Sequence, residues 1–237
     1  MATYNDFSCA HKVFNNDYIA FTANHISKQF RGCGGDVPKW IALLLDGVNA
    51  RSMMTLHRRV GLDKDNITIV EHDRETFDTL SANHPDCNFI FGQMQSYVQK
   101  ASFPSDQFNL AFFDWMCTIN GNNNEGRPLE ALSNFLCQTN RPYIVLAQTF
   151  CLRGEQKGNG DPYQASKDRV CNAIIRTAAR NGYQAMWNSY FESVYRREGG
   201  AVPMFFTCVV LVQNPGENSP EYLWAFYEKN QLHMRDR

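Results

Sequence analysis

The sequence predicts an α/β fold, an αβα sandwich with a seven-stranded, mostly parallel sheet that ends in an antiparallel hairpin, plus a helical N-terminal appendage. Three observations lead to this fold class. Short apolar runs alternate with segments of helical spacing through most of the chain, as repeated strand–helix units do. Near the end, two β-rich runs at 183–195 and 204–213 are joined by a short turn at 198–200, so they must be antiparallel. Residues 17–30, ahead of the first strand, have the apolar spacing of a further helix.

Five apolar runs predict the parallel strands, at 39–46, 66–71, 87–91, 108–113 and 142–148. Each is short, as expected for strands that are covered by helices on both faces. Helices are expected between and after them, at 50–60, 74–83, 94–101, 128–139 and 163–181. Gly61 and Gly182 follow two of these helices, where glycine commonly ends a helix, and Pro128 begins another.

The chain is expected to divide into three parts. Residues 1–36 form the helical appendage with a glycine-rich linker at 32–35, and residues 37–213 form the α/β domain. Residues 214–237 form a tail whose aromatic run, Tyr222 to Tyr227, packs either on the domain or on a partner. The sequence does not separate these two outcomes, and the oligomeric state stays open.

Composition excludes several classes of protein. Among 237 residues, 23 Lys and Arg face 24 Asp and Glu, so no overall charge excess points to a polyanionic partner. With 43% apolar residues the chain can bury a core, which argues against disorder. No apolar run approaches the roughly 20 residues of a membrane span, and the start has no signal-peptide pattern. Eight scattered cysteines without a C-x-x-C pair indicate free thiols and no metal site, and the expected location is intracellular, in the cytoplasm.

Acidic residues end three of the first four predicted strands. Asp46, Glu71 and Asp114 should therefore meet at the carboxyl edge of the sheet, where open parallel sheets bind their ligands. Glu71 follows Asp46 by about 25 residues, close to the spacing of ribose-binding acids in nucleoside-binding folds. An ionised carboxylate accepts hydrogen bonds from both ribose hydroxyls, so Glu71 is the leading candidate for a ligand contact.

On these residues the chain resembles the class I, Rossmann-like S-adenosylmethionine-dependent methyltransferases, as a divergent member. The resemblance covers about residues 37–213 and implies that S-adenosylmethionine is the cofactor of a transferase. By position it assigns Asp46, Gly47 and Asn49 to the methionine part of the cofactor and Glu71 to the ribose, with His72 beside the adenosine. It places Gly92, Gln93 and Met94 near the adenine, and Asp114 and Trp115 facing the methyl group.

The roles expected at the fourth strand are catalytic. Asp114 is a candidate base, or holds the acceptor or the amino group of the cofactor. Trp115 offers a flat face to a planar acceptor or to the sulfonium cation. A run of amides at Asn120 and Asn122 to Asn124 follows the same strand and is a candidate for substrate contact.

Two departures from the family pattern support an alternative function. The loop after the first strand, Asp46 to Arg51, keeps one glycine where the family has several, and no Pro-Pro follows Asp114. The alternative is a catalytically inactive, methyltransferase-like domain that serves as a structural or assembly subunit. Hydrolase and phosphate-transfer chemistry lack their G-x-S-x-G and Walker motifs.

The methyl acceptor is not encoded in any motif. Nucleic acid is one acceptor class left open, because the appendage contributes Lys12, Lys28 and Arg31, and small molecules or protein side chains are others. The basic residues Arg51, Arg58 and Arg59 are interpreted as a solvated helix face, because no aromatic residues alternate with them.

Overall fold

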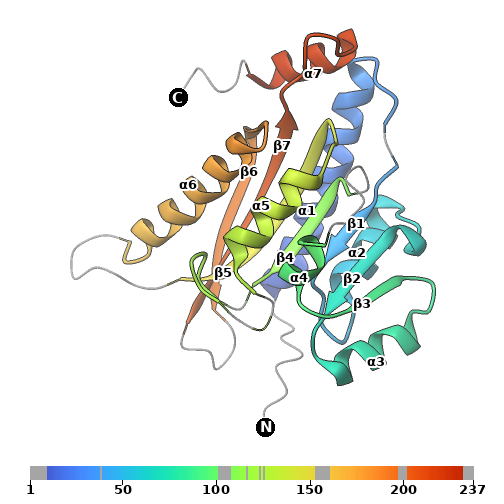
Figure 1. Ribbon diagram of the computed structural model, residues 1–237, viewed down its shortest axis with the longest axis vertical. Coiled ribbons are helices and arrows are strands. Elements are labelled where there is room, and N and C mark those ends of the chain that lie inside the picture. The colour runs from blue at the N-terminus through green and yellow to red at the C-terminus, as the bar shows by residue number, and fades with distance from the viewer. Residues whose placement is uncertain are drawn as a thin grey trace.

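The computed structural model describes residues 10–37, 39–100, 108–115, 117–122, 124, 126–152, 161–196 and 202–231. Its strands are β1 (Ala42–Leu44), β2 (Ile67–Glu71), β3 (Asn88–Phe91), β4 (Leu110–Asp114), β5 (Tyr143–Cys151), β6 (Tyr183–Arg196) and β7 (Pro203–Gln213). All seven form one sheet in the order β3-β2-β1-β4-β5-β7-β6 (Figure 1).

The pairing of the strands confirms the predicted fold class. β1 to β5 are mutually parallel, with Ala42 of β1 in register with Ile67 of β2 on one side and Leu110 of β4 on the other. β7 inserts between β5 and β6 and is antiparallel to both, so the expected hairpin is present. The turn expected at 198–200 lies outside the described residues. β5 is longer than the run at 142–148 because it continues along β7 to the pair Cys151–Met204.

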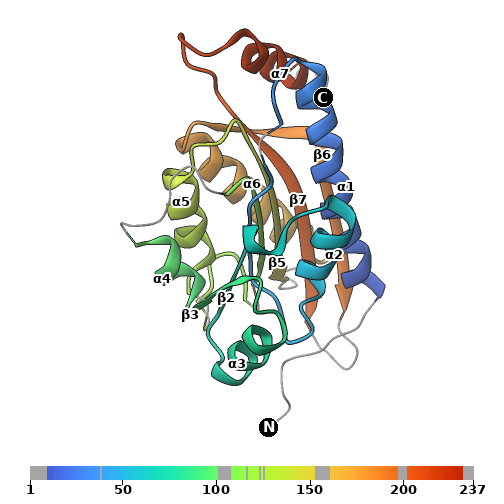
Figure 2. The same cartoon turned by 90° about the vertical axis from the view of Figure 1, so that its right-hand side faces the viewer.

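The helices are α1 (Ala10–Gly32), α2 (Arg51–Val60), α3 (Arg74–Asn83), α4 (Met94–Val98), α5 (Pro128–Gln138), α6 (Gln164–Arg180) and α7 (Glu221–Gln231), with a 3₁₀ turn η1 (Lys64–Asn66). Figure 2 shows α1 and α2 on one face of the sheet and α4, α5 and α6 on the other. α4 is shorter than the helix expected at 94–101, and its C-cap is Gln99.

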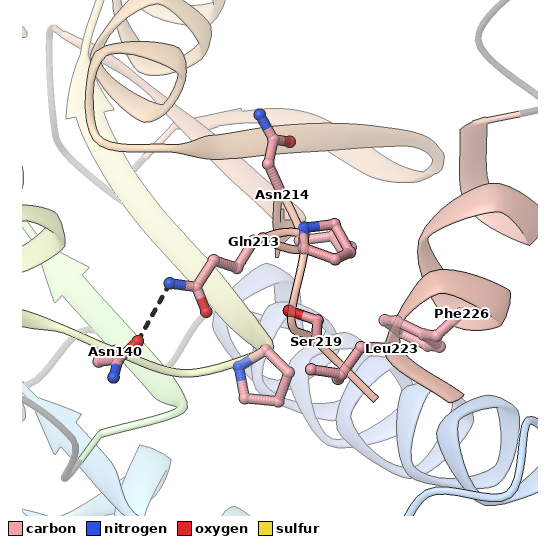
Figure 3. Close-up of a pocket in the computed structure, with 10 residues that line it drawn as sticks. Asn140, Gln213, Asn214, Ser219, Leu223 and Phe226 are labelled. Atoms are coloured by element: carbon pink, nitrogen blue, oxygen red, sulfur yellow. Dashed lines mark hydrogen bonds between the residues drawn. The ribbon is translucent and has the colours of Figure 1, made fainter. Parts of the chain in front are cut away.

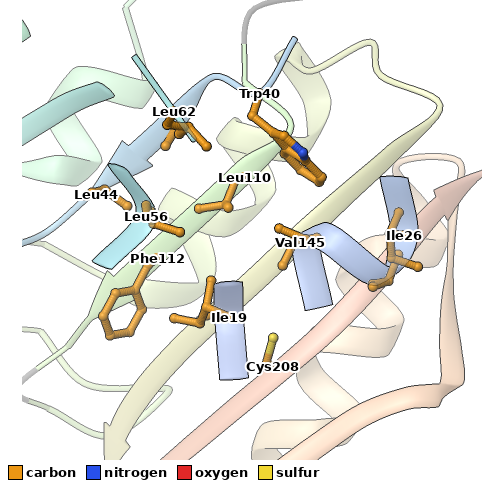
Figure 4. Close-up of a cluster of buried hydrophobic side chains, with 14 of the residues drawn as sticks. Ile19, Ile26, Trp40, Leu44, Leu56, Leu62, Leu110, Phe112, Val145 and Cys208 are labelled. Carbon is orange, nitrogen blue, oxygen red and sulfur yellow. The ribbon is translucent and has the colours of Figure 1, made fainter. Parts of the chain in front are cut away.

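Residue alternation along the strands divides the core into two apolar clusters. Leu44, Leu110 and Val145 belong to the cluster beneath α1 and α2, several of whose side chains are labelled in Figure 4. Their immediate neighbours Leu43 and Ala111 belong to the cluster beneath α4 to α6. Successive strand residues point to opposite faces of the sheet, so a residue that follows a member of one cluster faces the other cluster.

The helix expected as an appendage forms, together with α2, one of the two helical layers of the sandwich. α1 begins at Ala10, ahead of the expected start at 17, and buries Ile19, Ala23, Ile26 and Phe30 in the first cluster. The expected linker at 32–35 starts in the last residue of α1, and the Gly35 N–H donates to the Phe30 carbonyl at 3.2 Å. The division into parts at residues 36 and 213 stays a prediction.

The aromatic tail packs on the domain. It forms α7, in which Phe226 is buried with its ring centroid 5.1 Å from that of Phe30 in an edge-to-face arrangement. Tyr143 at the start of β5 lies in the same aromatic group, 5.7 Å from Phe226. These contacts of α7 lie within the chain, and binding of the tail to a partner stays a prediction.

Two further observations concern the chain as a whole. Among the described residues, no helix has the length and apolar character needed to cross a membrane. The cysteines in that part of the chain are free thiols, at positions 33, 87, 117, 137, 151, 171 and 208.

Candidate functional site

The three predicted carboxylates lie at the ends of three neighbouring strands. In the sheet order, β2, β1 and β4 are adjacent, and the chain reverses its direction of strand addition between β1 and β4. Asp46, Glu71 and Asp114 each lie two residues beyond a member of the first cluster, namely Leu44, Ile69 and Phe112. By strand alternation all three therefore belong to the face of the sheet that α1 and α2 cover.

Asp46 caps the helix that follows it. Its Oδ2 accepts from the N–H of Met53 at 2.8 Å, and its Oδ1 accepts from the N–H groups of Gly47 and Ser52 at 3.1 and 3.4 Å. These contacts serve the first turn of α2, whose N-cap residue Ala50 has no side-chain cap. Desolvation raises the pKa of Asp46 to about 6, against the opposing effect of these N–H donors and of the Lys12 ammonium. The backbone N–H groups and the Lys12 ammonium of α1 thus stabilise the negative charge of Asp46.

Ala50 carries the conformational cost of the glycine-poor loop. It adopts φ 47° and ψ 38°, in the left-handed region that favours glycine, and it is fully buried. Its N–H donates to the carbonyl of Gly47 at 2.8 Å, which closes the turn before α2.

Glu71 lies at the end of β2, at the start of the turn that leads into α3. It is 8% exposed, and its Oε1 accepts from the N–H of Asp73 at 2.7 Å. The Nδ1 of His72 lies 3.4 Å from the same oxygen. Asp73 in turn accepts from the N–H of Thr76 at 2.9 Å and so caps α3, which lowers the pKa of Asp73. Glu71 and His72 thus lie together on a turn fixed by hydrogen bonds, and their roles toward a cofactor stay predictions.

Asp114 has two partners that sequence reasoning did not assign to it. The Lys12 Nζ, from the start of α1, lies 2.9 Å from Oδ2, and the Thr149 hydroxyl of β5 donates to Oδ1. The sequence identifies Lys12 only as a basic residue of the N-terminal appendage. No local signal could have paired it with an acid 102 positions away. Lys12 also acts on the charge of Asp46, so α1 provides one cation to the ends of two adjacent central strands.

Trp115 and Met94 are placed in the core. Both are fully buried in the cluster beneath α4 to α6, and the Trp115 ring lies 5.7 Å from Phe113 in an edge-to-face contact. The expectation that Trp115 offers a flat face to an acceptor is therefore corrected. Because Asp114 points toward α1, the next side chain along the strand points to the opposite face. The Trp115 Nε1 has no hydrogen-bond partner among the described residues.

The remaining predicted residues lie at the surface of the edge. Gly47, Asn49 and Gln93 are exposed. Gly92 follows β3 with φ 149°, donates its N–H to the Glu71 carbonyl at 2.9 Å, and has open space where a Cβ would project. Asn120, Asn122 and Asn124 are exposed, and residue 123 of that amide run lies outside the described part of the chain.

Phe91, at the end of β3, is a neighbour that the sequence did not single out. Its ring is 48% exposed beside Gly92, and the Arg74 guanidinium lies 5.1 Å from the ring centroid. The signal available in the sequence was a large aromatic residue at a strand end, which occurs as often in a core.

A separate pocket lies at the end of the sheet where the parallel strands begin, opposite their carboxyl ends. Figure 3 shows it between the segment leading into β5 and the end of β7, with the Gln213 Nε2 donating to the Asn140 Oδ1 at 3.1 Å. Ser219, Leu223 and Phe226 line its other side. Because β5 begins there, this pocket is remote from the carboxylates. In the described part of the chain, no three His, Cys, Asp or Glu residues gather as a metal site would require.

Comparison with known proteins gives similarity in fold. No protein-family model and no curated protein sequence matches the chain. Among solved structures, the plantazolicin methyltransferase BpumL, in complex with SAH, has a TM-score of 0.52 at 11% identity, covering 88% of this chain and 87% of that one. An O-methyltransferase from Bacillus cereus in complex with SAH has a TM-score of 0.48 at 16% identity, over 88% of this chain and 84% of that one. An rRNA methylase from Streptococcus thermophilus has a TM-score of 0.47 at 14% identity, over 85% and 96%.

Proposed function

We propose that this chain, which has the fold of the class I S-adenosylmethionine-dependent methyltransferases, is itself such a methyltransferase. The observation that carries the proposal is the placement of Asp46, Glu71 and Asp114 on one face of the sheet. They lie at the ends of β1, β2 and β4 respectively, which are neighbours in the sheet. Ligands of open α/β sheets bind at this edge, beside the reversal of strand order.

The residues at the edge fit the nucleoside half of the cofactor. The Glu71 carboxylate is an acceptor at a strand end, as the two hydroxyls of a ribose require, and its side chain is 11% exposed. The open space beside Gly92, next to the half-exposed ring of Phe91, suits a planar base, with Gln93 at its border. The acids also suit a ligand that carries positive charge on its sulfur.

Fewer protein groups are left to contact the methionine half of the cofactor. The first N–H groups of α2 already donate to Asp46, so they are engaged by a side chain of the protein. Gly47 and Asn49 are exposed on the adjoining turn and are the residues proposed to contact the amino-acid part. Asp46 acts in this proposal by shaping that turn and by supplying negative charge.

Asp114 is the proposed catalytic residue. The chemistry supplied by bound S-adenosylmethionine is an electrophilic methyl group on a sulfonium sulfur. Lys12 and Thr149 each hold one oxygen of Asp114 and so fix the orientation of the carboxylate. From that position Asp114 orients an acceptor or takes its proton. The buried ring of Trp115 supports the strand end from the opposite face.

Thermal unfolding with and without S-adenosylhomocysteine tests the cofactor site. A ligand at about 100 times its dissociation constant adds roughly 2.7 kcal/mol to the folded state, so the parent protein should unfold at a higher temperature. Glu71→Ala should abolish this shift, and Glu130→Ala, on the exposed surface of α5, should retain it. A parent protein that shows no shift at millimolar S-adenosylhomocysteine or S-adenosylmethionine contradicts the proposal.

An inactive scaffold is the second candidate, and one observation favours it. Asp46 and Lys12 use their charges inside the protein, on the α2 N-terminus and on Asp114, where an active enzyme needs ligand contacts. The same unfolding experiment separates the two functions, because a scaffold without a cofactor gains no stability from either compound.

A further inference from the structure

Helix α1 exposes an aromatic stripe on its outer face. Phe14 and Phe21 are 53% and 64% exposed, and they stand seven residues apart, about 10 Å along the helix axis. Lys28 continues the stripe after another seven residues and is exposed. His25 stacks on Phe21 with the ring centroids 6.0 Å apart and the planes 12° from parallel. Large aromatic rings are seldom left this exposed on a helix that packs on its own core.

Helix α2 brings Arg59 next to this stripe. The Arg59 Nε lies 3.1 Å from Asp17 Oδ1, and the Arg59 carbonyl accepts from the Asn24 Nδ2 at 2.9 Å. Asp17 and Asn24 are four residues before and three residues after Phe21, so they adjoin it on the helix surface. Arg58 is exposed beside Arg59. The sequence had suggested a purely solvated arginine face, because the aromatic residues come from a different helix.

The charge of the two helices differs from that of the chain. α1 and α2 together contain six Lys and Arg residues and a single acid, Asp17, for a net charge of +5, whereas the whole chain carries −1. The basic residues are Lys12, Lys28, Arg31, Arg51, Arg58 and Arg59. Lys12 is paired with Asp114 of β4, so the two helices together with that acid carry +4, and positive charge gathered on one layer creates a local field that the average charge conceals.

The N-terminal end of the stripe lies near the proposed catalytic carboxylate. Lys12, two residues before Phe14, holds Asp114 at 2.9 Å, and α2 begins at the turn capped by Asp46. Lys12 projects from the core-facing side of α1, one heptad before buried Ile19, so Asp114 lies near the N-terminal end of the stripe, on the other side of the helix.

From these observations we infer that the α1–α2 face binds single-stranded nucleic acid and presents it to Asp114 as the methyl acceptor. Bases stack on Phe14 and Phe21, and Arg58 and Lys28 contact the phosphates. Exposed aromatic rings flanked by basic side chains match the two contacts that single strands need, stacking and charge neutralisation. An acidic peptide would match the charge alone. The acceptor role rests on the proposed function, whereas binding of the strand does not.

Fluorescence anisotropy of the full chain with a labelled single strand tests the surface. The probes are RNA and DNA oligonucleotides of about 16 nucleotides and mixed sequence, at about 50 mM salt, with a duplex and polyglutamate as competitors. Binding should weaken as salt rises, and Arg58→Ala should lower the slope of log K against log salt by about 0.7. Phe21→Ala should weaken binding at least fivefold, as expected for loss of one stacked base, and Phe21→Trp should retain it.

Matched controls lie elsewhere on the surface. Trp224→Ala removes an exposed aromatic side chain of α7, and Arg180→Ala removes an exposed arginine of α6, so both variants should bind like the parent. Parent-like binding by Phe21→Ala, absence of binding by either oligonucleotide, or displacement by polyglutamate as effectively as by single strands would overturn the inference.

The cofactor experiment keeps the two proposals apart. Phe21→Ala should keep the thermal shift with S-adenosylhomocysteine, because Phe21 is not among the residues proposed to contact the cofactor. Suppose that the protein binds the oligonucleotide but shows no thermal shift with S-adenosylhomocysteine. That result would overturn the proposed methyltransferase activity and the acceptor role, but it would leave the proposed nucleic-acid-binding surface standing.

Discussion

The Nζ of Lys12 lies 2.9 Å from Oδ2 of Asp114, and this ion pair ties the first helix to the end of the fourth strand across 102 sequence positions. The two side chains are 32% and 19% exposed, so the pair is partly shielded from water. It joins the layer that carries the basic, aromatic face to the strand end proposed for catalysis. The position of α1 and the orientation of Asp114 are thereby coupled.

A double-mutant cycle measures this coupling. Lys12→Met and Asp114→Asn should each destabilise the protein, and the double variant should lose less than their sum, with a coupling energy of about 1 kcal/mol at neutral pH. The pair is shielded more than a surface ion pair, which supports a value at the upper end of the surface range. Urea unfolding of the four proteins gives the coupling, and strictly additive losses would mean that the contact contributes nothing in solution.

The stability of the protein should depend on pH through Asp46. Burial raises its folded pKa to about 6, so the folded state binds its proton more tightly than the unfolded chain does. The contribution of Asp46 is fully present below about pH 4 and is lost as pH rises through 6, a change of up to about 3 kcal/mol. In Asp46→Asn that change is absent, so the stability of the parent relative to this variant should fall between pH 4 and 7.

Asp73 provides the opposite sign as a control. The Thr76 N–H lowers the pKa of Asp73, so its stabilising effect is present near neutral pH and is lost in acid. The stability of the parent relative to Asp73→Asn should therefore rise with pH below about pH 4 and stay level between pH 4 and 7, where the Asp46 comparison falls. Unfolding free energies from urea titrations at several pH values check both, and an Asp46 comparison that stays level or rises between pH 4 and 7 would contradict the assignment for Asp46.

Ala50→Gly should stabilise the protein by about 1 kcal/mol. Ala50 has a left-handed backbone, which costs a residue with a Cβ roughly that amount more than glycine. The matched control is Ala82→Gly, on the exposed side of α3, where glycine should destabilise by up to about 1 kcal/mol. Thermal unfolding midpoints should thus move in opposite directions, and a lower midpoint for Ala50→Gly would mean that the turn is not strained.

Ile26→Ala should show that α1 belongs to the core. Ile26 is fully buried in the first cluster, so its truncation should cost about 2–5 kcal/mol, as in other cores. Phe21→Ala, on the opposite side of the same helix, should change stability by less than about 0.5 kcal/mol. Similar losses in the two variants would contradict the observed packing of α1.

Part of the site could be predicted because it depends on local patterns. Asp46, Glu71 and Asp114 each follow an apolar run, and the ends of parallel strands share an edge, so their common location followed from the order of elements. The burial of Trp115 also follows from alternation once the face of Asp114 is known. That face was not available from the sequence, so the ring was wrongly expected to be exposed.

The sequence by itself determined the αβα class, the parallel strands, the closing hairpin and the acids at the strand ends, because hydrophobic period and turn residues act over a few neighbouring positions. Only the tertiary structure decided that α1 is a layer of the sandwich, that α7 packs on Phe30, and that Lys12 and Thr149 hold Asp114. Only it brought Asp17 and Asn24, on the helix surface around Phe21, into contact with Arg59 of α2. These contacts join positions far apart in the chain, and they depend on which face of the sheet each helix covers, a choice made by the packing of the whole core.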